Sequence, residues 1–152
     1  MLIRDRYDII GVVGRGAEAE VLHAVDRQLD RDVAMKVRIV NSGTERDALL
    51  REARVLLSVR PHPNLPLVRE DFFEGDRYFI VMDWIDGQSL AVRSEEAAPT
   101  ASIQEVVDDL WPVAEALDHL HDHDPPVVHR DVKPANIIRR PDGRLEIGRA
   151  HV

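Results

Sequence analysis

The stretch HRDVKPAN, residues 129–136, decides the fold. It precedes the apolar pair Ile137 and Ile138, so the pattern predicts a loop that runs into a strand. Lys133 in this stretch and Lys36 are the two lysines among 20 basic residues, the others being arginine. Such a bias is typical of a G+C-rich gene, and a lysine kept against it indicates a position that needs a compact ammonium group. Asp131 and Asn136 also have a simpler interpretation, as side chains that cap a loop.

The composition bounds the class of protein. The chain has 152 residues, a net charge of −8 and no cysteine, which excludes disulfides and thiolate metal sites and suits a reducing cytoplasm. Its acidity argues against a nucleic-acid partner. The N-terminus does not resemble a signal peptide, and no apolar run approaches the roughly 18 residues of a spanning helix, so we expect no membrane segment.

Hydrophobic periodicity predicts the regular elements. They are strands at 7–13, 20–26 and 32–38, a helix at 45–58, two strands around the turn 74–76, and a helix at 103–121. Asp142 and Gly143 predict the turn of a last hairpin. A small β-rich unit with one helix is thus followed by helical structure, which favours two lobes over one layered domain.

Each predicted helix has a cap signal and an apolar stripe. Thr44 with Asp47, and Ser102 with Glu105, resemble capping boxes. The first stripe contains Leu49, Ala53, Leu56 and Leu57; the second contains Ile103, Val106, Val107, Leu110, Ala114, Leu117 and Leu120. Glu52 lies on the first stripe, and an inward carboxylate requires a cation as partner. Pro112 is expected to kink the second helix.

The glycine-rich segment from Gly14 to Ala19 is ambiguous alone. Two glycines let the backbone approach an anionic ligand closely. The spacing also matches a dinucleotide-binding fingerprint, with 17–26 as its helix and Asp32 near its acidic position. A plain hairpin turn is the third interpretation. The segment itself does not choose among them.

Five motifs in order resemble the eukaryotic-type protein kinases, especially the bacterial serine/threonine kinases. They are the loop Gly14-x-Gly16-x-x-Ala19-x-Val21, VAMK at 33–36, Glu52, the hinge-like IVMDWIDGQSL at 80–90, and HRDVKPAN. Ala19 departs from the third glycine of the loop. The dinucleotide interpretation leaves Lys36, Glu52 and HRDVKPAN unexplained, so the kinase resemblance is favoured.

The resemblance implies ATP and Mg²⁺ as cofactors and serine or threonine hydroxyls of proteins as acceptors. Gly14 and Gly16 would approach the phosphates, and Lys36, held by Glu52, would bind them. The implied adenine contacts are Val21, Ala34, Met82 and the backbone of Asp83 and Ile85. Asp131 would accept or orient the hydroxyl proton, Lys133 would neutralise the γ-phosphate, and Asn136 would hold the metal. His129 would support this loop, and a metal site at His119, His121 and His123 is disfavoured by their alternate spacing.

The expected fold class is α+β and protein-kinase-like, a complete β-rich N-lobe with one helix followed by the beginning of a helical C-lobe. We expect the N-lobe at 7–82, a hinge at 83–90 and the start of the C-lobe at 91–147. Alternatives are a pseudokinase-like module that binds a nucleotide or a partner, and a small-molecule phosphotransferase. The intact Lys36, Glu52, Asp131 and Asn136 argue against the former, and Lys133 against the latter.

The C-terminal residues predict that this chain is inactive by itself. The family's metal-binding aspartate is expected near position 149, where Arg149 stands, and a cation there would repel Mg²⁺. IGRAHV, residues 147–152, matches one reading frame of a widely used sequencing adapter, so we expect a non-native tail and a longer cytoplasmic parent. Bacterial members of the family often carry a membrane helix after the kinase domain.

Overall fold

A computed structural model describes residues 1–92 and 102–148, and its contacts divide the chain into two units. The first unit comprises Met1–Ser58 and Leu67–Trp84, and the second comprises Val59–Pro66 and Ile85–Val152. The contacts therefore group residues 59–66 with the second unit, although they lie inside the expected N-lobe 7–82.

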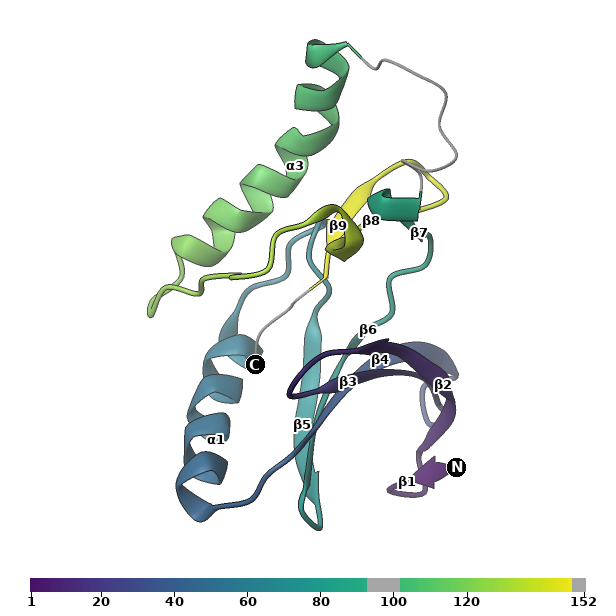
Figure 1. The fold of residues 1–152 in the computed structure, drawn as a ribbon, viewed down its shortest axis with the longest axis vertical. Helices are drawn as coiled ribbons and strands as arrows, with labels where there is room; N and C mark the ends of the chain where they lie inside the picture. Colours follow the sequence, from purple (N-terminus) through teal and green to yellow (C-terminus); the bar gives the residue numbers. More distant parts are fainter. Residues whose placement is uncertain (93–101, 149–152) are drawn as a thin grey trace. The chain divides into compact units, whose positions relative to one another are not determined.

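The first unit is a curled antiparallel sheet of six strands in the order β1-β2-β3-β4-β6-β5 (Figure 1). The strands are β1 (Leu2–Ile3), β2 (Tyr7–Arg15), β3 (Glu20–Asp26), β4 (Arg31–Ile39), β5 (Val68–Glu74) and β6 (Arg77–Asp83). The five strands expected from periodicity are confirmed. Residues 20–26 form a strand that pairs antiparallel with β2 and β4, so the helix required by the dinucleotide interpretation is absent there.

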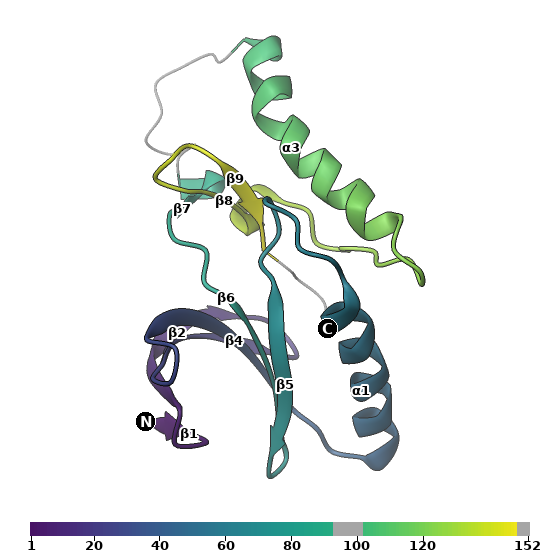
Figure 2. The ribbon, with the colours of Figure 1, turned by 180° about the vertical axis from the view of Figure 1, so that it is seen from behind.

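Helix α1 (Gly43–Ser58) runs beside β5 in both ribbon views (Figures 1 and 2). Leu49, Ala53 and Leu56 are buried as predicted, whereas Leu57 is 37% exposed. The predicted cap at Thr44 and Asp47 is wrong by two residues. The Ser42 hydroxyl accepts the Glu45 N–H at 3.2 Å, and the Glu45 carboxylate accepts the Asn41 N–H at 3.1 Å, which forms the capping contacts one half-turn earlier.

One face of the sheet carries the apolar core of this unit. Val33 and Met35 of β4 are fully buried on it, and Val37 packs at its edge, as the alternation of the strand predicts. The other members are Ile3, Tyr7, Leu22, Ala24, Phe72, Phe79 and Val81, with Ile9 at the edge.

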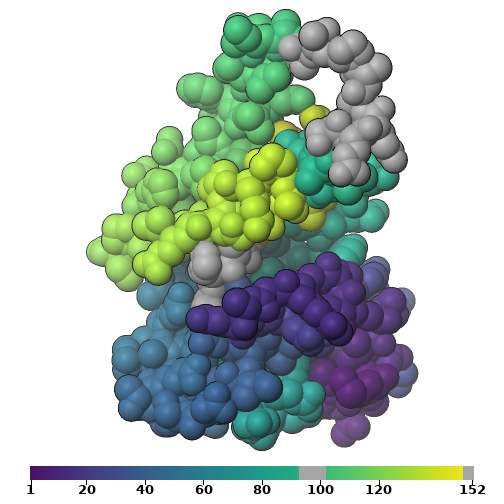
Figure 3. Space-filling model, in the orientation of Figure 1, coloured from purple at the N-terminus to yellow at the C-terminus, as the bar shows by residue number. Residues whose placement is uncertain are grey.

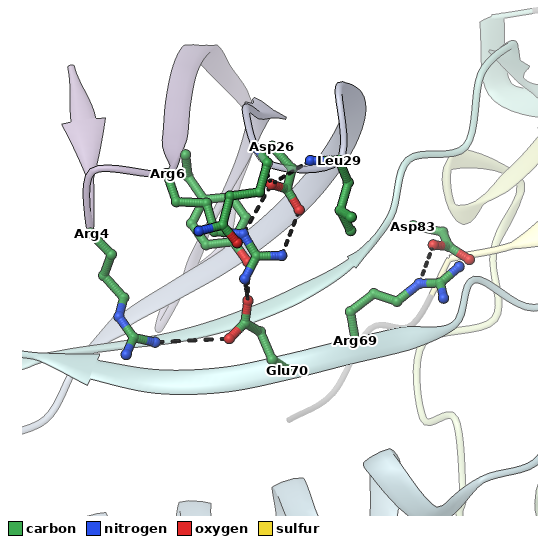
Figure 4. A network of polar contacts seen from close by, with 9 residues as sticks. Arg4, Arg6, Asp26, Leu29, Arg69, Glu70 and Asp83 are labelled. Carbon is green, nitrogen blue, oxygen red and sulfur yellow. Dashed lines mark hydrogen bonds and ion pairs between the residues drawn. The ribbon is translucent and has the colours of Figure 1, made fainter.

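A polar network holds the N-terminal strand to this sheet (Figure 4). Asp26 is 1% exposed, and its carboxylate accepts two hydrogen bonds from the Arg6 guanidinium, at 2.9 and 2.7 Å. A third Arg6 nitrogen donates to Glu70 at 2.8 Å. The hydrogen bond from Arg6 lowers the pKa of Asp26 despite its burial. Arg4 and Asp5 in the connecting turn have φ of 52° and 53°, a strained region for such residues, so the network stabilises a turn that is locally unfavourable.

The second unit contains a small sheet, a long helix and a short 3₁₀ turn. Strands β7 (Gln88–Ser89), β8 (Ile137–Arg139) and β9 (Leu145–Ile147) form the sheet, α3 (Ile103–His121) is the helix, and η1 (Pro134–Asn136) is the turn. The predicted hairpin is confirmed between β8 and β9, where Gly143 has φ 89° and its N–H donates to the Arg140 carbonyl at 2.9 Å.

Helix α3 buries only the C-terminal end of the predicted stripe. Its capping box at Ser102 and Glu105 is confirmed, and the helix continues through Pro112 to His121. The buried residues are Val113, Ala116 and Leu120, which join the core with Ile137, Leu145 and Ile147. Leu120 is buried and Leu117 packs against this core as predicted, whereas the earlier members of the predicted stripe, from Ile103 to Ala114, are exposed. Its first residue, Ile103, is 85% exposed, and this part of α3 lies on the surface at the top of Figure 3, in green.

Among the residues that the structure describes, none of the helices combines the length and the apolarity needed to cross a membrane.

Candidate functional site

Strand register gathers four predicted residues on one face of the first unit's sheet. Val21 pairs with Lys36, and Ala34 pairs with Met82. Directly paired residues point to the same side of a sheet, as do residues two apart along one strand. Val21, Ala34, Lys36 and Met82 therefore share the face opposite the apolar core, where Lys36 is half-buried.

The glycine-rich segment forms the hairpin between β2 and β3. The Gly16 N–H donates to the Ala19 carbonyl at 2.8 Å and closes the turn. A Cβ on Gly16 would lie 3.4 Å from that carbonyl oxygen, whereas one on Gly14 would meet the Val21 Cβ at an ordinary 3.7 Å. The hairpin thus places Gly14 beside Val21, and sterics constrain Gly16 more than Gly14.

Glu52 does not lie on the buried ridge of α1. Its side chain is exposed, which corrects the expectation of an inward carboxylate, because Leu49, Ala53 and Leu56 turn Glu52 to the side of the ridge. The pKa of Tyr78 is raised mainly by the burial of Tyr78 and by its 2.9 Å hydrogen bond to Asp71. The negative charge of Glu52 adds a smaller contribution in the same direction. Tyr78 lies two residues before Ile80, which pairs with Lys36. Tyr78 and Lys36 are thus on the same side of the sheet, and the pairing of Glu52 with Lys36 stays a prediction.

The segment expected to contact adenine begins at the end of β6. Met82 is 6% exposed. The Asp83 N–H donates to the Leu67 carbonyl at 3.0 Å, and its carboxylate accepts from Arg69 at 2.7 Å. Because the Asp83 N–H already has this partner, the backbone group with which Asp83 could contact adenine is its carbonyl. Ile85, 8% exposed, belongs to the second unit.

HRDVKPAN forms a compact polar cluster in the second unit. The Asn136 amide donates to both the carbonyl and the carboxylate of Asp131, each at 2.8 Å, and the Lys133 ammonium lies 3.4 Å from the other carboxylate oxygen. Asp131, Lys133 and Asn136 are therefore brought together as expected. With both amide hydrogens turned to Asp131, Asn136 Oδ1 is left as an oxygen donor of the kind that Mg²⁺ prefers.

His129 holds the backbone of this cluster through hydrogen bonds of its ring. It is 4% exposed; its Nδ1 accepts the Asp131 N–H at 3.2 Å, and its Nε2 bonds to the Gly148 carbonyl. An Nδ1 that accepts implies that Nε2 carries the proton in the neutral ring. Arg130 between them has φ 66°, an uncommon conformation that aims the loop. His129 thus fixes the backbone of Asp131, as predicted.

Sequence reasoning missed Asn64. The Asn64 side chain is 5% exposed; its amide donates to the Leu145 carbonyl at 2.6 Å. The backbone carbonyl of Asn64 accepts the Ile147 N–H at 3.0 Å. The Gly148 N–H in turn donates to the Asn136 carbonyl at 2.8 Å. Asn64 therefore anchors β9, which carries the chain back to the cluster. The sequence offered little to predict this role, since Asn64 is simply a polar residue in the proline-rich segment that follows the first helix.

The histidines at the end of α3 have other partners. The His119 ring bonds to the Arg60 carbonyl and the His123 ring to the Pro125 carbonyl, each at 2.9 Å. Within residues 1–92 and 102–148 no group of three or more metal-ligating side chains occurs. Arg149, expected at the metal aspartate position, lies outside the described residues, and so does most of the tail 147–152. Ile147 itself is fully buried in β9.

Comparison with known proteins shows the family of the chain. The protein kinase domain family matches residues 7–148. The chain is 33% identical over 150 residues to the probable serine/threonine-protein kinase PknB of Lactococcus lactis, covering 96% of this chain and 23% of that protein. It is 31% identical over 147 residues to the serine/threonine-protein kinase PrkC of Bacillus subtilis, covering 95% and 22%. A putative cyclin-dependent kinase F-2 of rice is 34% identical over 154 residues, covering 94% and 46%.

The chain thus spans less than half the length of each of these relatives. The family match covers both units, from the first residue of β2 to the end of β9 and Gly148. The chain belongs to the protein kinase family and is similar to its bacterial serine/threonine kinases.

Proposed function

We propose that the protein to which this chain belongs transfers the γ-phosphoryl group of ATP to serine or threonine hydroxyls of other proteins. The observation that carries the proposal is the contact of Asp131 with both Asn136 and Lys133. A carboxylate, an ammonium and an amide oxygen donor are the groups that this reaction needs around its acceptor hydroxyl.

Asp131 accepts or orients the proton of the acceptor hydroxyl. Its carboxylate is half-buried; one oxygen accepts the Asn136 amide at 2.8 Å, and the other lies 3.4 Å from the Lys133 ammonium. His129 holds the backbone of Asp131 through its N–H, so the carboxylate is positioned before the substrate arrives.

Lys133 and Asn136 stabilise the charge that develops on the transferred group. The Lys133 ammonium is 54% exposed, so it can leave Asp131 and pair with the γ-phosphate at small cost. Asn136 would hold Mg²⁺ through Oδ1, and the metal would neutralise the phosphate oxygens when bound.

The first unit would bind the nucleotide. Val21, Ala34 and Met82 offer apolar contacts to adenine on the sheet face that carries Lys36. Lys36, paired with Glu52, would bind the α- and β-phosphates, and the amides of the Gly14–Gly16 turn would approach the phosphates.

The 152-residue chain itself is proposed to be inactive. Arg149 stands where the family's second metal ligand is expected, and a guanidinium there would oppose a divalent cation by Coulomb repulsion. Binding of ATP to the chain without transfer of phosphate is the expected behaviour.

The experiment measures incorporation of ³²P from γ-labelled ATP into a generic serine/threonine substrate by the longer parent protein, with Mg²⁺. Asp131→Asn should lower the rate by about 10²–10⁴-fold, the usual contribution of a positioned base. Asp118→Asn, an exposed carboxylate on α3, is the matched control and should keep the parental rate.

Two results would oppose the proposal. Equal incorporation by the parent and its Asp131→Asn variant would remove Asp131 from the chemistry. Nucleotide binding by the parent without any transfer would favour a binding module. For the 152-residue chain, incorporation that is lost on Asp131→Asn would overturn its proposed inactivity.

A further inference from the structure

A pocket of about 730 Å³ opens in the first unit on the sheet face opposite Lys36. Its floor is built by Leu22, Val37 and Phe79, one from each of β3, β4 and β6. Val37 pairs directly with Phe79, so these side chains form a continuous apolar surface. The volume falls within the roughly 300–1,000 Å³ of small-molecule sites.

Exposed apolar residues surround the mouth of this pocket. Val12 is 44% exposed, Ile39 is 59% exposed and Met1 is 72% exposed, and all three line it. Clustered exposed apolar side chains beside a concave apolar floor are typical of a binding site rather than of ordinary surface. The proposed kinase function uses none of these residues.

The charged groups at the rim already have partners of opposite sign. Arg38 donates to Glu45 at 2.8 Å, Arg77 donates to Glu74 at 3.0 Å, and Glu20 pairs with Arg15 at 3.1 Å. A charged ligand would have to replace one of these pairs or bury its charge against the apolar floor, which is unfavourable. An uncharged ligand leaves them intact.

We propose that this pocket binds a small, uncharged molecule with a largely apolar body. The apolar body would rest on Leu22 and Phe79, which are only 6% and 0% exposed, and would remove the exposed side chains of Met1, Val12 and Ile39 from water. A single hydroxyl or carbonyl group could reach the polar rim. The turn Gly16–Ala19 contributes one wall, so the ligand would contact the glycine-rich hairpin from the side away from Lys36.

The test titrates the 152-residue chain with 1-pyrenemethanol and with its two charged analogues, 1-pyrenecarboxylate and 1-pyrenemethylammonium. Pyrene fluorescence reports affinity, and methyl NMR shifts report position. We expect saturable binding of the alcohol, at least about tenfold tighter than either ion, which corresponds to about 1.4 kcal/mol. Methyl shifts are expected at Ile9, Leu22 and Val37, and not at Ile80 or Met82 on the other face.

Val12→Glu places a charge at the mouth without disturbing the core and should weaken binding of the alcohol by about tenfold. Leu29→Glu is the matched control, since Leu29 is 54% exposed and lies in the β3–β4 turn away from the pocket. It should change affinity by less than about twofold. If Val12→Glu unfolds, the shift map of the unaltered chain decides the question.

Four outcomes would overturn the proposal. These are no saturable binding of 1-pyrenemethanol, tighter binding of either ion, shifts confined to Ile80 and Met82, or equal affinities for the Val12→Glu and Leu29→Glu variants. None of these outcomes depends on phosphate transfer, so they leave the proposed kinase function untouched.

Discussion

Replacing Arg6 by methionine should destabilise the first unit strongly. Arg6 is the partner of Asp26, whose carboxylate is 1% exposed and accepts two of its hydrogen bonds at 2.9 and 2.7 Å (Figure 4). After the substitution, the donors to that carboxylate among the described residues are the backbone N–H groups of Gln28 and Leu29, at 3.0 and 3.4 Å. Asp26 would then be a buried and poorly compensated charge.

The expected loss is about 3–5 kcal/mol of the free energy of unfolding, the usual cost of removing one partner of a buried ion pair. Arg6→Met with Asp26→Asn should lose less than the sum of the two single variants, because asparagine removes the uncompensated charge. Arg69→Met is the matched control. The side chains of Arg69 and Asp83 are 36% and 33% exposed, so losing their contact should cost about 0–1 kcal/mol.

Urea unfolding followed by Trp84 fluorescence provides the assay, in a Trp111→Phe background, since Trp84 lies in the first unit and Trp111 in the second. A loss below about 1 kcal/mol for Arg6→Met would refute the reasoning. Strict additivity in the double variant would refute it as well, because the two groups would then not be coupled.

Three further predictions concern the second unit. Asn64→Ala should lower the free energy of unfolding by about 1–3 kcal/mol, because the buried Leu145 carbonyl loses its hydrogen-bond donor. Urea unfolding followed by Trp111 fluorescence in a Trp84→Phe background measures this loss, and an unchanged midpoint would contradict the prediction. Gly87→Ala should destabilise the β7–β8 pairing, since φ is 137° and a Cβ would lie 2.0 Å from the Arg139 carbonyl oxygen; hydrogen exchange of the β8 amides should rise. Burial, and after it the charge of the neighbouring His119, lowers the pKa of His62 in the folded chain. Around the ordinary histidine pKa of about 6.5 the unfolded chain therefore binds more protons than the folded chain, so the free energy of unfolding should fall from pH 7 to pH 5.5. His62→Asn should flatten that slope.

Local patterns predicted the strands of the first unit well. Alternation in 20–26 and 32–38 reflects one buried face of a sheet, and the structure places Val33 and Met35 there. The capping box at Ser102 and Glu105 was also predictable, because it needs only four consecutive residues. Such features depend on neighbours in the sequence, which a single chain displays directly.

Other features depend on distant partners. Val106 and Val113 of α3 are both apolar, so its sequence did not reveal which side meets β9, and only Val113 is buried. Asn64 acts through Leu145, 81 residues away. Helical spacing predicted that Glu52 faces inward, but the side of the helix that is buried is the one with Leu49, Ala53 and Leu56, which leaves Glu52 exposed. The cluster of Asp131 and its neighbours was predicted from resemblance, and its distances required the structure.

The most direct test of the account is a single-turnover measurement on the longer parent protein with γ-labelled ATP, Mg²⁺ and a protein substrate, followed by identification of the modified residue. The account predicts an acid-stable phosphoserine or phosphothreonine, formed at a rate that Asp131→Asn lowers by about 10²–10⁴-fold and Asp118→Asn leaves unchanged. A label that is acid-labile, or a rate that does not depend on Asp131, would contradict it.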